Sequence, residues 1–104
     1  MWKDGNNEYD DYLKRVLDKQ PVIVPHCCSS PEMHYFLYEH AKKRGSAWVW
    51  CSSCRSFSHY DGVMIPEGHQ NNPEISLSEL RAEPVILDAK KELVDSFNRS
   101  IFPL

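Results

Sequence analysis

The chain has 104 residues, of which 41% are hydrophobic, 12% aromatic and 26% charged, and its formal net charge is −3. A chain of this length builds one domain with a modest core, so we expect a single domain over residues 1–104. No apolar run is long enough to span a bilayer, and the polar N-terminal segment lacks the apolar core of a secretory signal. We therefore expect a cytoplasmic protein with no membrane partner, whose four cysteines stay reduced.

The first expected element is a helix over residues 7–19. Asn6 or Asn7 could cap its N-terminus, and Pro21 ends it. Residues 21–25, which lie between two prolines, form either an edge strand or an extended connector. The helix is predicted from apolar side chains at helical spacing, which are Tyr9, Tyr12, Leu13, Val16 and Leu17.

Residues 33–60 are expected to form a meander of about three antiparallel strands, with turns near residues 43–46 and 52–53. The density of aromatic residues and the polar turn at residues 42–45 favour strands, although residues 32–40 could also belong to a helix and the CxxC could lie within one long bulged strand. In the strand over residues 47–53, alternation places Trp48 and Trp50 on one face, and Val49 and Cys51 on the other.

The C-terminal third begins with a loop over residues 61–73, which is rich in glycine, proline and asparagine. Ser76 and Glu79 match a capping box that opens one helical turn, and a final helix over residues 88–100 has Asp88 as its possible cap. The predicted fold class is α+β. A small antiparallel sheet of about three to four strands packs on one face against the N- and C-terminal helices.

The cysteines allow two interpretations. Cys51 and Cys54 flank a tight turn, and such a hairpin is half of a zinc ribbon. Cys27 and Cys28 are adjacent rather than a second CxxC, and neighbouring side chains of an extended segment point to opposite faces. We therefore favour no metal and no cofactor, with the cysteines as small core residues. The alternative is a zinc site of Cys27, Cys28, Cys51 and Cys54, with His26, His34 and His59 as further candidate ligands.

Two other chemistries receive little support. A redox CxxC usually lies in a strand-to-helix turn, whereas both flanks here indicate strands. Cys51 or Cys54 could pair with His59 and Asp61 as a nucleophile, but no glycine-rich oxyanion loop accompanies them. We therefore expect no enzymatic activity.

Nucleic-acid binding is also disfavoured. The basic residues 42–44 lie close in sequence to Tyr38, Trp48 and Trp50, which could stack bases. The negative net charge argues against this partner, and three bases in a turn are typical of a solvated hairpin tip.

Protein binding fits the composition better. The aromatic residues exceed what one face of a small sheet can bury, so some are expected to be exposed among acids and to act as binding hot spots. They are Trp2, Tyr9, Tyr12, Tyr35, Tyr38, Trp48, Trp50, Phe57 and Tyr60.

With these residues in view, the chain resembles the small cytoplasmic immunity proteins that are encoded beside bacterial polymorphic toxins, including contact-dependent growth-inhibition systems. The resemblance covers about residues 35–97. It rests on Tyr35–Tyr38, on the segment from Gly45 to His59 with its aromatic-CxxC-aromatic-His pattern, and on a later proline-containing loop. It also includes Leu80, Glu83, Pro84 and a closing helix with Leu93, Val94 and Phe97. The loop of similar proteins carries tryptophans, which residues 66–69 lack.

The resemblance implies a protein without catalytic residues that binds a cognate toxin domain and blocks it. Many toxin domains attack nucleic acids and are basic, so an acidic surface could mimic their substrate and steer association. The alternative is a zinc-ribbon-like structural module that contacts nucleic acid or protein. The expected toxin-binding residues are two acids near the N-terminus and four in the acidic loop region, namely Asp10, Asp11, Glu67, Glu74, Glu79 and Glu83.

Overall fold

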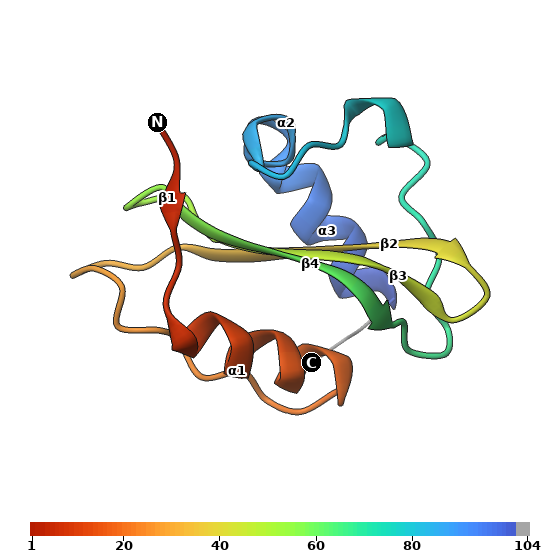
Figure 1. Cartoon of the computed structure of the whole chain (residues 1–104), viewed down its shortest axis with the longest axis horizontal. Helices are drawn as coiled ribbons and strands as arrows, with labels where there is room; N and C mark the ends of the chain where they lie inside the picture. The colour runs from red at the N-terminus through yellow and green to blue at the C-terminus, as the bar shows by residue number, and fades with distance from the viewer. Residues whose placement is uncertain (102–104) are drawn as a thin grey trace.

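Four strands form one mixed sheet at the centre of the computed structural model, which describes residues 1–101 (Figure 1). The predicted antiparallel meander is confirmed, because β2, β3 and β4 pair in this order. A short first strand, β1, was not predicted, and it pairs with β4 in parallel. The sheet order is β1-β4-β3-β2, and the strands are β1 (Lys3–Asp4), β2 (Met33–Ala41), β3 (Arg44–Cys51) and β4 (Ser56–Met64).

The helices begin where the sequence supplies caps. The Oδ1 atom of Asn6 accepts a hydrogen bond from the backbone N–H of Glu8 at 2.9 Å, which confirms the predicted N-cap. The backbone N–H of Ser76 donates to Oε1 of Glu79 at 2.9 Å, as the capping-box pattern predicts. The helical elements are α1 (Asn7–Leu17), the 3₁₀ turn η1 (Leu77–Glu79), α2 (Val85–Ala89) and α3 (Lys91–Ile101).

Two local predictions need correction. The single C-terminal helix is in fact two helices, α2 and α3. Asp88 therefore lies within α2 and caps nothing, because Pro84 already begins that helix. Of the two alternatives predicted for residues 21–25, the structure has the connector. Among the residues that the structure describes, no helix is both long enough and apolar enough to cross a membrane.

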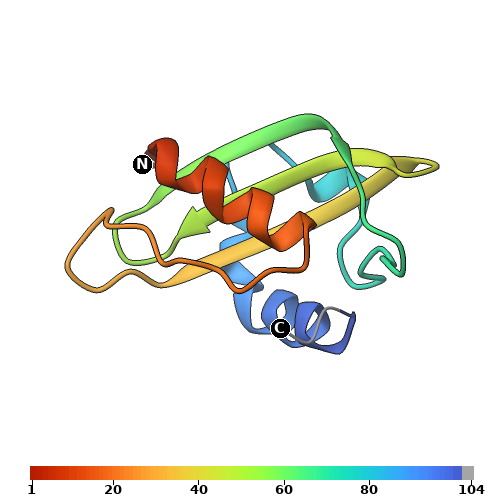
Figure 2. The same cartoon turned by 90° about the horizontal axis from the view of Figure 1, so that it is seen from below.

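The sheet is covered on both faces, which corrects the prediction that all helices pack on one face. α1 lies against one face, and α2 and α3 lie beyond the other (Figures 1 and 2). Val49 and Cys51 of β3 pack with α1, whereas Trp48 and Trp50 pack with residues of α2 and α3. The alternation in β3 thus serves two apolar cores, one on each side of the sheet.

Because there are two cores, the aromatic side chains are hidden rather than displayed. Trp50 has no exposed surface, and Trp48 is 3% exposed. None of the nine aromatic residues expected to include exposed hot spots is fully exposed; Tyr38, Phe57 and Tyr60 are half-buried and the other six are buried. The prediction of an exposed aromatic surface is therefore wrong.

Candidate metal centre

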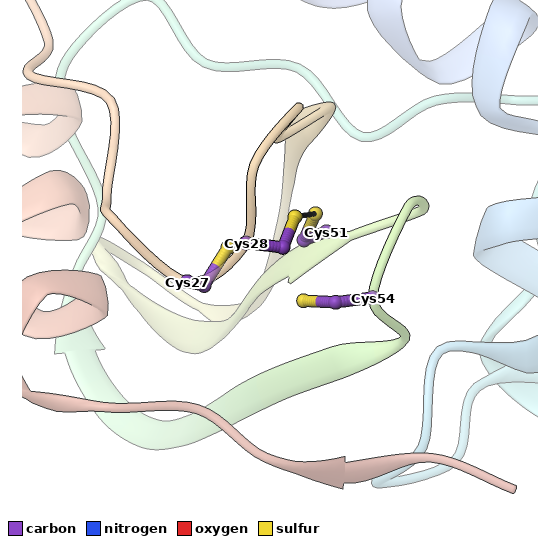
Figure 3. A group of neighbouring side chains, drawn as sticks. All are labelled: Cys27, Cys28, Cys51 and Cys54. Carbon is purple, nitrogen blue, oxygen red and sulfur yellow. Dashed lines mark hydrogen bonds between the residues drawn. The ribbon is translucent and has the colours of Figure 1, made fainter.

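The four cysteines meet at one end of the sheet, between the loop that precedes β2 and the turn that joins β3 to β4. Cys27 and Cys28 come from the loop, Cys51 is the last residue of β3, and Cys54 lies in the turn (Figure 3). All four are free thiols. Cys51 is fully buried, and the other three are half-buried.

The sulfur positions match the size of a tetrahedral thiolate site. The four Sγ atoms all lie within 4.8 Å of one another. The Sγ atoms of Cys28 and Cys51 are 3.9 Å apart. Four sulfurs at the usual Zn–S distance of about 2.3 Å occupy a tetrahedron with edges of about 3.8 Å. The observed cluster is thus close to the dimensions that zinc requires, and none of its four cysteines is in a disulfide.

The participation of both adjacent cysteines contradicts the sequence-based argument against this site. That argument treated residues 27–28 as extended, so that their side chains would diverge. The backbone instead bends through residues 27–30, and this bend brings both thiols to the same side. The prediction failed because alternation holds only for regular strands.

Hydrogen-bond donors surround the sulfurs. The backbone N–H of Glu32 donates to Sγ of Cys51 at 3.4 Å. The hydroxyl of Ser56 lies 3.0 Å from Sγ of Cys54 and 2.5 Å from the hydroxyl of Tyr9. Donors of this kind stabilise negative charge on sulfur, which metal-bound thiolates carry.

The thiols also perturb each other's acidity. Burial raises the pKa of Cys27 to about 12. Burial opposes ionisation of Cys54 as well, but hydrogen bonds from Ser56 and from the neighbouring thiols outweigh it and lower the pKa of Cys54 to about 7. Thiolates packed this closely repel one another, which opposes the ionisation of all four at once. A divalent cation would allow all four to ionise.

The loop that supplies two of these cysteines has no regular secondary structure of its own. Residues 18–32 contain no helix or strand. The loop is attached to α1 through His26, whose backbone N–H and Nδ1 each lie 2.9 Å from the carboxylate of Glu8. That ion pair is solvent-exposed, so it contributes little to stability. The cysteine cluster thus joins this loop to the sheet, together with the buried Pro25 and the hydrogen bond from the backbone N–H of Ser52 to the carbonyl of Glu32 at 2.9 Å.

The structure separates the residues of the nucleophile hypothesis. Cys51 and Cys54 both pack in the core beneath α1, whereas His59 stacks on Trp48 at the opposite face of the sheet, with ring centroids 4.6 Å apart. The imidazole and the thiol therefore cannot form a catalytic pair. Trp48 and Trp50 cannot stack on bases of a nucleic acid either, because both are buried.

The six acids predicted to bind a toxin do not form one surface. Asp10 and Asp11 lie on α1, and Glu67 lies near its end, where the Nζ atom of Lys19 donates to the carbonyl of Glu67 at 3.2 Å. Glu74, Glu79 and Glu83 lie around η1 and α2, on the other side of the sheet. A compact partner could contact one of these two groups at a time.

Three of the six acids already have cationic partners. Asp11 pairs with Arg15 at 3.0 Å, Glu67 with Lys43 at 3.0 Å and Glu79 with Lys90 at 2.9 Å. A hydrogen bond from Lys43 holds the pKa of Glu67 below its usual value. Hydrogen bonds from the backbone N–H of Ser76 and from the side chain of Lys90 hold the pKa of Glu79 below its usual value.

Sequence reasoning missed a second polar cluster, centred on the buried His34. Its Nδ1 lies 2.9 Å from the carboxylate of Asp95, and its Nε2 lies 2.8 Å from that of Glu32. Burial alone would lower the pKa of His34, but the two carboxylates outweigh it and raise this pKa. The cluster joins β2 to α3 and to the cysteine-bearing loop, and no local sequence pattern indicates it.

Comparisons of the chain with protein-family models, with curated proteins and with solved structures find no match.

Proposed function

We propose that this protein binds one zinc ion through Cys27, Cys28, Cys51 and Cys54. The observation that carries the proposal is the convergence of the four sulfurs within 4.8 Å. A four-thiolate site is closed, with no coordination position left for substrate, and such sites are structural. The protein is then a zinc-stabilised module whose surface, rather than its metal, meets other molecules.

Zinc would act as a clamp between two parts of the chain. It would fix the bend at residues 27–30 to the turn after β3, and so hold in place the loop over residues 18–32, which contains no helix or strand. Zinc binds the folded arrangement far better than the unfolded chain, so its binding free energy becomes folding free energy.

The test is metal analysis of the full chain, purified without chelator. We expect one zinc per chain and a fall in melting temperature when a chelator removes it. Cobalt substitution should add the absorption bands of a tetrahedral thiolate site, and these bands should be lost in Cys54→Ser. The proposal would be refuted if the purified protein contained no metal and its melting temperature changed with neither zinc nor chelator.

Neutralisation of a toxin remains a second proposal, because exposed carboxylates remain available to a basic partner. Asp10, Glu74 and Glu83 form no ion pair among those found in the described residues, and each is exposed. Stoichiometric binding to a basic toxin domain would be steered by these charges.

The neighbouring gene provides the test of this second proposal. If it encodes a large secreted protein with a variable C-terminal domain, that domain should kill cells, and co-expression of this chain should rescue them. Toxicity that persists despite demonstrated binding would count against neutralisation. The zinc measurement is independent of this outcome.

A further inference from the structure

One edge of the sheet is open along most of its length. β4 extends from Ser56 to Met64, but β1 pairs only with Ser56 and Phe57. The last hydrogen bond between them runs from the N–H of Gly5 to the carbonyl of Phe57 at 2.7 Å, after which the chain turns into α1. Figure 2 shows none of the described segments of the chain beside the outer edge of β4 along the rest of the strand.

The backbone groups that face this edge can be identified from the register. The carbonyls of Arg55 and Phe57 accept hydrogen bonds from β1, so they point outward. Because the outward direction recurs every second residue, the N–H and C=O groups of His59 and Asp61 also point outward. Beyond Asp61, a bulge interrupts the register with β3. The open stretch thus offers two donors and two acceptors to an added strand.

At the opposite edge of the sheet, by contrast, side chains bind the backbone groups of the outer strand. On β2, the amide of Asn71 bonds both backbone groups of Glu39, at 2.8 and 3.0 Å. Asn98 of α3 donates to the carbonyl of Tyr35 at 2.7 Å. Proteins usually protect an edge in this way against pairing with other chains. No comparable cover protects His59 and Asp61 within the described residues.

Carboxylates flank the open stretch. Asp61 projects on the face of His59, with its side chain 78% exposed. Asp10 approaches from α1 and accepts a hydrogen bond from the hydroxyl of Tyr60 at 2.5 Å. Asp4 lies where β1 ends, and with Asp10 it lines a hollow beside residues 57–60. The basic residues Lys3 and Arg55 lie at one end of this stretch and Arg44 lies at the other, while Nε2 of His59 is 3.4 Å from the carboxylate of Asp61.

We infer that the outer edge of β4 binds an extended, basic segment of a partner protein, which adds to the sheet as a strand beside His59 and Asp61. Backbone hydrogen bonds would supply the affinity, and Lys or Arg side chains on the added strand would meet Asp10 and Asp61. A second copy of this chain fits less well, because pairing two β4 edges would bring like charges together. The inference does not depend on zinc. It rests on the second proposal, because it names the surface through which a basic toxin domain would bind.

The test uses the zinc-treated full chain and two extended probe peptides in a valine background. Each carries either lysine or glutamate at two adjacent positions, so that one charge lies on each face of the added strand. Before any peptide is added, hydrogen exchange should be faster at the amides of His59 and Asp61 than at those of Ser58 and Tyr60. The lysine peptide should slow exchange at His59 and Asp61 and shift their NMR signals, whereas the glutamate peptide should not.

Two variants separate the contributions of charge and backbone. Asp10→Asn with Asp61→Asn keeps the edge and should weaken lysine-peptide binding by roughly 2- to 30-fold, the range expected for two exposed charge pairs. Asp61→Pro removes an outward N–H and should abolish binding. Asp18→Asn, an exposed change at the end of α1, is the matched control and should bind normally.

Three results would overturn the inference. These are slow exchange at His59 and Asp61 in the free monomer, lysine-peptide shifts elsewhere or nowhere, and concentration-dependent dimers that protect the edge. Each result leaves the zinc stoichiometry and the toxin-rescue experiment unaffected, so failure here is distinguishable from failure of either proposal.

Discussion

Replacing each cysteine by serine, one at a time, separates a metal site from ordinary packing. Cys51 has no exposed surface, whereas Cys27, Cys28 and Cys54 are half-buried. If the cysteines are only core residues, the fall in the free energy of unfolding should be larger for the more deeply buried cysteine. Cys51→Ser would then cost about 1–3 kcal/mol, and the other three variants would cost less.

A zinc site predicts four nearly equal losses, because zinc binding needs every ligand. With free zinc at about 1,000 times its dissociation constant, the metal contributes about 4 kcal/mol to the free energy of unfolding. For a domain of this size, that is a fall in melting temperature of roughly 16–32 °C. Each variant should show this fall regardless of the burial of the cysteine it removes.

The assay is thermal unfolding of the wild-type chain and the four variants, with zinc and with chelator. Chelator should lower the wild-type melting temperature to about the variants' range and leave the variants almost unchanged. Ser53→Ala, an exposed change in the same turn, is the control and should behave as wild type. Losses graded by burial, together with indifference to chelator, would refute the reasoning.

Three further predictions concern the rest of the fold. His34→Gln should destabilise the protein more at about pH 6 than at about pH 9 in urea titrations. Because the pKa of His34 is raised in the folded state, the protonated imidazole stabilises the fold fully below the pKa of the unfolded state. This stabilisation is lost as the pH rises through the pKa of the folded state. An equal loss of stability at both pH values would contradict this. Asp88→Ala should cost about 1–3 kcal/mol in the same titrations, because it removes the acceptor of Trp50 Nε1 at 3.1 Å; an unchanged midpoint would show that this bond is dispensable. Gly45→Ala should cost about 1–3 kcal/mol, since its Cβ would collide with the Tyr38 carbonyl, and wild-type stability would disprove the close packing there.

Local sequence signals anticipated the regular elements well. The spacing of Tyr9, Leu13 and Val16, together with the Asn6 cap, is sufficient to predict α1. The alternation of Trp48 to Cys51 correctly predicted which side chains share a face. That same run is apolar on both faces, which indicates a sheet covered on both sides, yet the prediction placed the helices on one face.

Features that depend on tertiary contacts were beyond the sequence. β1 has two residues and no pattern, and it exists because β4 offers it an edge. The metal centre depends on the bend at residues 27–30, where the prolines and serines around Cys27 and Cys28 permit a turn but do not specify one. The polar cluster around His34 joins this residue to Asp95, which lies 61 positions later in the sequence.

The zinc content of the freshly purified chain, measured with the protein concentration in the same sample, is the most direct check. The account predicts one zinc per chain in the wild type and almost none in Cys54→Ser. Equal and negligible zinc in both, with the wild type still folded, would contradict it.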